Sequence, residues 1–165
     1  MARLIKRRHL EDDLWQVLQA DEAIPVNGDV LVPLSVWQTQ LPSLRQRNGA
    51  TGVWLGPSDD PADVEPFPDL VAVHFPVFTD GRGYSTARLL RQRYGFAGEL
   101  RAIGDILRDQ LYELARCGFD SFLLRADQDA QLALCAFDDF SNAYQSAADQ
   151  GALFERRFRR EKRVA

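Results

Sequence analysis

The residues best placed to do chemistry lie in one short polar run, Asp80-Gly81-Arg82-Gly83-Tyr84-Ser85-Thr86. Two glycines one residue apart let a backbone turn tightly and approach a ligand closely. A helix is expected to begin directly afterwards, and its free N–H groups and positive dipole end favour an anion. Arg82 could add a bidentate contact to a phosphate, sulfate, sulfite or carboxylate. We therefore predict an anion site formed by Gly81, Arg82, Gly83, Tyr84, Ser85 and Arg108.

The same run has a purely structural interpretation, a strand–helix turn with Asp80 as the cap and Arg82 in solvent. Asp105 follows the next expected strand, with Arg108 and Asp109 close behind. A carboxylate beside an anion site can move a proton or hold a metal ion. The alternative is an N-cap next to a surface Arg–Asp pair, because aspartate is a favoured cap. The candidate catalytic residues are Asp80, Asp105 and Asp109.

Several kinds of site find no support in the sequence. The glycine run lacks the third glycine of a dinucleotide-binding fingerprint, and no Gly-Lys-Ser/Thr follows it for a P-loop. The histidines, His9 and His74, and the cysteines, Cys117 and Cys135, form no metal-binding cluster. No haem or iron–sulfur cysteine pattern is present. No metal is predicted and no cofactor is encoded by a recognisable motif, so any redox cofactor would come from outside the chain.

Strands that alternate with helices must position these residues. Apolar runs predict five short strands, at residues 30–33, 52–55, 70–75, 100–103 and 119–124. Helical spacing predicts helices after Ser35, over Tyr84–Tyr94 and Ile106–Cys117, and from about Asp127 to Ala147. Residues 3–18 suggest a basic lead-in followed by a short amphipathic piece. Arg101 is unusual, because a charge inside a short strand either lies on an exposed face or points into the site.

Such alternation is typical of an α/β fold with a mostly parallel sheet. We expect an open three-layer sheet, with a partial βα barrel as the alternative. In both, the loops that carry Asp80 and Asp105 lie at the carboxyl ends of neighbouring strands, where α/β proteins bind ligands.

Length and charge narrow the remaining possibilities. The chain has 165 residues and a net charge of −4, and it contains no apolar run near the roughly 20 residues of a membrane span. Residues 1–150 are expected to form one domain, and residues 151–165 a flexible basic tail. The acidic body argues against nucleic-acid binding. Two cysteines with no pairing pattern fit a reducing cytoplasm.

Several longer segments resemble a known bacterial family of unknown function. They are RLIK, EDDLW, VPLSVW, GVWL, FTDGRGYSTARLLRQRYG, GELRAIGDILRDQL, CGFDSFLLR and FDDFSNAYQ. That family is usually encoded beside assimilatory sulfite reductase and is often labelled as an oxidoreductase of sulfite reduction. The likeness covers residues 3 to about 146. The resemblance implies a cytoplasmic role in sulfur assimilation, and it implies no set of catalytic residues.

Two functions follow, and whether the chain is an enzyme stays open. The first is an accessory protein of sulfite reduction that binds sulfite reductase or an oxyanion, with Asp80, Arg82 and Asp105 lining the site. The second is a small enzyme that holds an anionic soluble substrate with Arg82 and uses Asp105 or Asp109 as acid or base. Nucleic-acid binding by the tail is a distant third. No membrane partner is expected, and self-association stays open.

Overall fold

The structure is a computed structural model that describes residues 3–138. Its strands are β1 (Arg3–Lys6), β2 (His9–Asp12), β3 (Gln16–Val17), β4 (Val30–Pro33), β5 (Thr51–Leu55), β6 (Leu70–Phe75), β7 (Glu99–Gly104) and β8 (Ser121–Leu123). Its α-helices are α1 (Leu34–Leu44), α2 (Arg82–Arg88), α3 (Leu111–Arg116) and α4 (Ala130–Ala133). Shorter helical turns are η1 (Pro61–Val64), η2 (Leu89–Arg93), η3 (Arg108–Gln110) and η4 (Leu134–Asp138).

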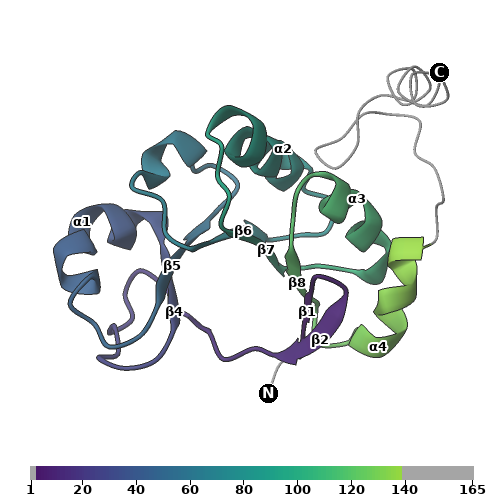
Figure 1. The fold of residues 1–165 in the computed structure, drawn as a ribbon, viewed down its shortest axis with the longest axis horizontal. Helices are drawn as coiled ribbons and strands as arrows, with labels where there is room; N and C mark the ends of the chain where they lie inside the picture. The colour runs from purple at the N-terminus through teal and green to yellow at the C-terminus, as the bar shows by residue number, and fades with distance from the viewer. Residues whose placement is uncertain (1–2, 139–165) are drawn as a thin grey trace, which may run out of the picture.

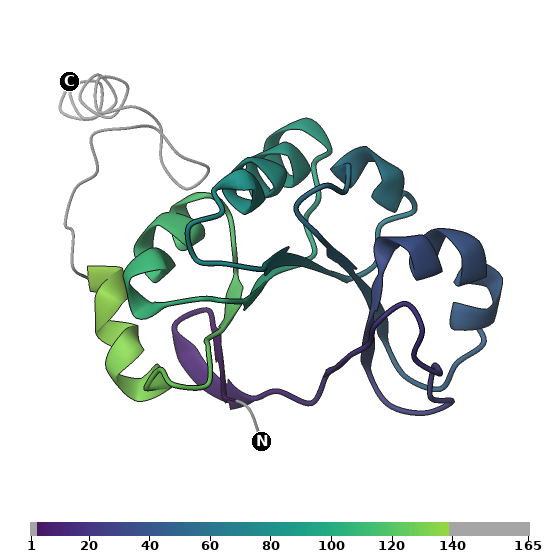
Figure 2. The same ribbon diagram turned by 180° about the vertical axis from the view of Figure 1, so that it is seen from behind.

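The eight strands form one sheet in the order β2-β1-β8-β7-β6-β5-β4-β3. The strands from β3 to β8 pair in parallel, whereas β1 runs antiparallel to both β8 and β2. The sheet curls into a half-barrel, and the helices lie along its outer, convex side (Figure 1; Figure 2 from behind). Because parallel neighbours share one direction, the loops that follow β5 to β8 all meet at one edge, which we call the carboxyl edge.

Alternation along each strand divides its side chains between two apolar layers. In β7, Leu100 and Ala102 face the helices and belong to the larger cluster, whose members come from the convex side of the sheet and from the helices. Ile103 faces the concave side, where it packs in a smaller cluster with Leu31, Leu70 and Ala72. Tryptophan side chains of residues 15 and 54 border this smaller cluster. The concave side is therefore a second core without helices.

The N-terminal segment completes the sheet at both of its ends. The β1–β2 hairpin extends the sheet beyond β8, and Arg7 and Arg8 make its turn with positive φ angles of 47° and 67°. From Asp13 the chain then runs across the concave side to β3, next to β4 (Figure 1). The amphipathic piece expected at residues 3–18 is therefore wrong. Its residues form three short strands, two of them edge strands, and edge strands carry charged and polar side chains that hide an apolar pattern.

The predicted strands are confirmed, and the predicted arrangement needs correction. The runs at 30–33 and 70–75 match β4 and β6, and those at 52–55, 100–103 and 119–124 each overlap a strand. The open three-layer sheet is wrong, because the helices cover the convex face alone. The partial barrel, our alternative, describes the sheet, which has eight strands instead of five.

The observed helix boundaries differ from the predicted ones more than the strand boundaries do. The helix expected at Tyr84–Tyr94 begins earlier, at Arg82, and its second half is the wider turn η2. The helix expected from Ile106 begins only at η3 and α3. Helical residues after the position of Asp127 are α4 and η4, and the expected continuation to residue 147 and the basic tail lie outside the described residues. Within residues 3–138, no helix combines the length and the apolar character needed to span a membrane.

Candidate functional site

Four loops meet at the carboxyl edge, namely residues 56–60, 76–82, 105–109 and 124–129. They contain every predicted catalytic residue, so the sequence placed these side chains at the correct end of the sheet. The loops carry seven aspartates and three arginines and no other charged residue. We refer to these four segments as the carboxyl-edge loops.

Asp80 and Arg82 bind each other. The Nε and Nη2 atoms of Arg82 donate to the two carboxylate oxygens of Asp80, at 3.0 and 2.7 Å. The backbone N–H of Arg82 also donates to Asp80, at 3.1 Å, and Gly81 between them is the N-cap residue of α2. The Arg82 hydrogen bonds lower the pKa of the Asp80 carboxyl, and the same contact raises the pKa of the guanidinium. The fork that we expected to face an anion is therefore occupied by a carboxylate of its own loop.

The remaining residues of the glycine run divide between packing and solvent. Gly83 is buried, and a Cβ there would overlap the ring of Phe75, so this glycine lets α2 approach β6 closely. A Cβ added at Gly81 would contact no atom, and Gly81 is the residue just before the first turn of α2. Tyr84 packs edge-on against Phe75 with ring centroids 5.6 Å apart, and burial raises the pKa of its hydroxyl. Ser85 is exposed. We predicted a close approach of this backbone to a ligand, and the close approach that Gly83 makes is to Phe75 of β6.

Asp105 ties three loops together. Its Oδ2 accepts from the backbone N–H of Phe78 at 2.9 Å, and its Oδ1 accepts from Nη1 of Arg125 at 2.8 Å. Arg125 also donates from Nε and Nη2 to Asp127, at 2.6 and 2.8 Å. These hydrogen bonds lower the pKa of Asp127 to about 2 and raise that of Arg125. The expected helix cap is wrong for Asp105, because both of its oxygens are used between loops.

Arg108 and Asp109 lie at the outer rim of the same edge. Asp109 is 88% exposed, and its carboxylate is 3.7 Å from the Arg108 guanidinium. The backbone N–H of Arg108 donates to the side chain of Gln128 at 3.3 Å. This is the surface Arg–Asp pair that we gave as the alternative interpretation. The structure thus gathers all three candidate aspartates at one edge and engages each with an arginine.

Sequence reasoning missed the two apolar side chains at the centre of this edge. Val77 and Phe78 are 50% and 49% exposed, although both are large and hydrophobic. The backbone around Phe78 is held on both sides, because its N–H donates to Asp105 and its carbonyl accepts from Nε2 of Gln110 at 3.0 Å. Two apolar residues within an otherwise polar strand-end loop are the pattern that could have revealed them.

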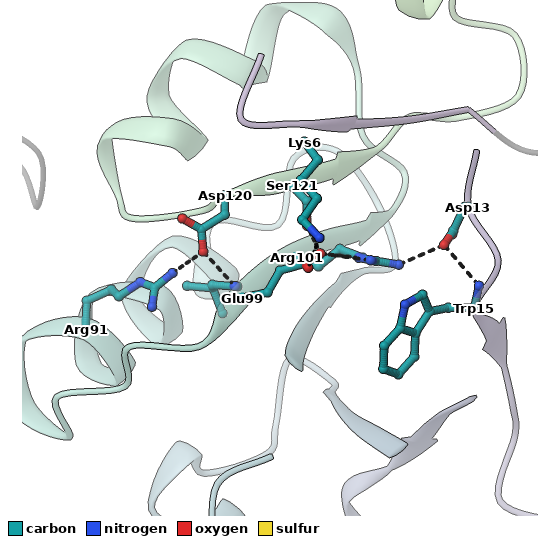
Figure 3. Close-up of polar contacts among 9 residues, drawn as sticks. Lys6, Asp13, Trp15, Arg91, Glu99, Arg101, Asp120 and Ser121 are labelled. Carbon is teal, nitrogen blue, oxygen red and sulfur yellow. Dashed lines mark hydrogen bonds and ion pairs between the residues drawn. The ribbon is translucent and has the colours of Figure 1, made fainter. Parts of the chain in front are cut away.

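A second charged cluster lies on the concave side, toward the opposite edge (Figure 3). Arg101, 1% exposed, donates from Nη1 to Asp13 at 2.9 Å and from Nη2 to Glu99 at 2.8 Å. Glu99 also binds Lys6 at 2.7 Å and accepts from the Ser121 hydroxyl at 2.6 Å. We call these five residues the buried ionic cluster. Arg101 therefore points neither to solvent nor to the carboxyl-edge loops.

His74 and the two cysteines take no part in the hydrogen bonds and ion pairs given above for the two clusters. His74 faces the concave side against Trp54, with ring centroids 5.7 Å apart, and burial lowers the pKa of its imidazole. Cys117 is buried, which raises its thiol pKa, and Cys135 is exposed. Between residues 3 and 138, no three His, Cys, Asp or Glu side chains gather as a metal site would require.

Comparison with known proteins identifies a family. Residues 52–154 match the family described as a bacterial protein of unknown function (DUF934). No curated protein and no solved structure matches the chain. The matched segment contains β5 except its first residue, β6 to β8, and all four carboxyl-edge loops. Since it covers more than half of the 165 residues, the chain belongs to the bacterial DUF934 family.

Proposed function

We propose that this protein is a cytoplasmic accessory protein of assimilatory sulfite reduction that acts by binding sulfite reductase. The pathway and the partner come from the resemblance described above. The carboxyl-edge loops are the proposed binding surface. A protein of this kind needs no redox cofactor of its own, since the reductase carries out the electron transfer.

The observation that carries the proposal is the presentation of Phe78. An aromatic side chain that is half exposed while its backbone is hydrogen-bonded on both sides loses little conformational freedom on binding. Such side chains are typical anchors of protein interfaces, where a few aromatic and arginine residues supply most of the binding energy. Val77 beside it enlarges the apolar area, and Asp109 and Asp127, 88% and 56% exposed, supply charge at the rim.

An oxyanion is a less suitable ligand for this surface. Arg82 donates from Nε and Nη2 to Asp80, and Arg125 is shared between Asp105 and Asp127. A sulfite or sulfate ion would have to compete with carboxylates that already hold these arginines at bidentate geometry. A net excess of four aspartates in the same loops also repels anions.

The alternative, a small enzyme acting on an anionic substrate, rests on the group formed by Asp105, Arg125 and Asp127. A general base must reach the proton that it removes with a free oxygen. Both oxygens of Asp105 accept hydrogen bonds, and Asp127, with its pKa lowered to about 2, is a weak base at neutral pH. The geometry thus favours the binding protein over the enzyme.

The test measures binding to purified sulfite reductase by surface biosensor. Phe78→Asp places a charge at the anchor and should weaken binding at least about tenfold, because hot-spot truncations cost about 2 kcal/mol or more. Val26→Asp is the matched control, since Val26 is 73% exposed but precedes β4, at the other edge of the sheet. It should leave binding unchanged, and thermal melting should show both variants folded.

A deletion strain provides the second readout. Loss of the gene should slow growth on sulfite as the sulfur source, and Phe78→Asp should fail to restore it where Val26→Asp succeeds. If the wild-type protein does not bind the reductase and the deletion strain grows normally on sulfite, the proposal is wrong.

A further inference from the structure

We infer that the carboxyl-edge loops bind a basic protein surface, one that offers an apolar pocket for Phe78 surrounded by lysine and arginine side chains. This inference rests on the proposed function and specifies the chemistry of its partner. Three observations support it. They are the net charge of the carboxyl-edge loops, the exposure of their aspartates, and the different net charge of the opposite edge of the sheet.

The charges around Phe78 are predominantly negative. The four loops hold seven aspartates against three arginines. Each arginine is already next to an aspartate of the same edge, at 2.7 Å for Arg82, 2.8 Å for Arg125 and 3.7 Å for Arg108. The positive charge is therefore neutralised locally, and the surplus that a partner would meet is carboxylate.

Four of the seven aspartates of these loops are exposed, where a partner would meet them. Asp109 and Asp127 have side chains that are 88% and 56% exposed, and Asp60 and Asp129 are exposed as well. The pKa of Asp127, lowered to about 2 by Arg125, keeps it charged at any physiological pH. Exposed rim charges of one sign steer an oppositely charged partner and exclude partners of the same sign.

The opposite edge has a different balance. The segments that precede β4, β5, β6, β7 and β8, with the turn between β1 and β2, are residues 7–8, 18–29, 45–50, 65–69, 94–98 and 117–120. They carry four arginines and six acidic residues, an excess of two acidic residues against four at the carboxyl edge. The negative excess is thus larger at the edge that presents Phe78. A basic partner would be oriented toward the carboxyl edge before contact is made.

The experiment uses single-charge variants of the full chain and purified sulfite reductase at low and high salt. Asp109→Asn removes an exposed negative charge and should weaken binding about two- to fivefold, the size of one exposed ion pair. Arg82→Gln releases Asp80 and should strengthen binding by a similar factor. Both differences should shrink as salt is raised, because exposed charges are screened. Asp69→Asn, an exposed aspartate just before β6 at the opposite edge, is the control and should change nothing.

The inference predicts opposite changes in binding affinity for Asp109→Asn and Arg82→Gln, so the experiment can contradict it. If Arg82→Gln weakens binding where the inference expects stronger binding, the inference is wrong. Wild-type binding that salt does not weaken and that neither variant changes would overturn the inference and leave the proposed function intact. If the wild-type protein does not bind the reductase at any salt concentration, both fall together.

Discussion

The molecule carries two clusters of ion pairs that use the same residue types in opposite settings. At the carboxyl edge the arginines lie in solvent, with Arg82 60% and Arg125 43% exposed, and their partners Asp80 and Asp105 are 10% and 20% exposed. In the buried ionic cluster, Arg101 and Asp13 are 1% and 5% exposed. Distances in the two are almost equal, 2.7 and 2.8 Å against 2.8 and 2.9 Å. Contact length therefore says little about the role of an ion pair here, and burial decides it.

Burial changes the role of an ion pair because a charge removed from water loses its hydration, and its protein partners must replace that stabilisation. An exposed ion pair is screened and adds little to stability, so its residues are free to serve recognition. A buried pair gains little net stability over an apolar pair of the same shape, but losing one partner leaves an uncompensated charge. The carboxyl edge is thus suited to binding, and the buried ionic cluster to holding the N-terminal segment in place.

The largest expected effect comes from breaking the buried ionic cluster. Arg101→Ala leaves Asp13 and Glu99 without their shared partner and should reduce the free energy of unfolding by about 3–5 kcal/mol. Urea denaturation measures it. Arg82→Ala is the control from the exposed cluster and should leave the denaturation midpoint almost unchanged. Equal losses in both variants would mean that burial does not separate the two clusters.

A smaller effect should separate the two glycines that flank Arg82. Gly83→Ala drives a methyl group into the Phe75 ring and should cost about 1–3 kcal/mol of unfolding free energy, the usual range for overpacking. Gly81→Ala meets no atom and has an ordinary φ of −77°, so it should be neutral or slightly stabilising. The melting curves of the two variants test whether the glycine run stabilises the fold through the packing of Gly83 against Phe75. Two equally destabilised variants would contradict that view.

The smallest expected effect is a change in pH dependence at Glu99. Burial alone would raise the pKa of this carboxyl, but hydrogen bonds from Lys6, Ser121 and Arg101 outweigh it and the pKa is lowered. A lowered pKa in the folded state means that the carboxylate contributes stability above its unfolded pKa, and that this contribution is lost as pH falls through the folded value. Wild type and Glu99→Gln should therefore differ most near neutral pH.

Denaturation of both proteins at several pH values between about 7 and about 3 tests this. The gap in unfolding free energy should narrow toward acid. A gap that stays constant or widens would show that Glu99 is not the group that titrates.

Local pattern was enough to predict the middle of the sheet. β4 and β6 were located residue for residue because each is an unbroken apolar run, as strands buried on both faces must be. The parallel order expected from the strand–helix alternation also placed Asp80 and Asp105 correctly at one edge. Gly118 follows the end of α3 with a φ of +107°, the conformation that favours glycine after a helix. These features depend on near neighbours in the chain.

Features that depend on distant residues were missed or wrong. The strands β1, β2 and β3 have no apolar run, and they pair only because other parts of the sheet offer them free edges. Asp105 was expected to cap a helix, but Arg125, twenty positions away, engages it instead. Phe78 was overlooked because exposure of an apolar side chain is decided by what the rest of the chain leaves uncovered.

The sequence by itself determined the strands from β4 to β8, their parallel direction, and the gathering of Asp80, Arg82, Asp105 and Asp109 at one edge. Only the tertiary structure decided that the sheet curls, that the helices cover its convex face alone, and that Arg82 is already bound by Asp80. It also decided that Arg101 is buried with Asp13, which lies 88 positions away in the chain. The physical reason is that strand formation follows from local apolar runs, whereas curvature, burial and charge pairing depend on contacts between segments far apart in sequence.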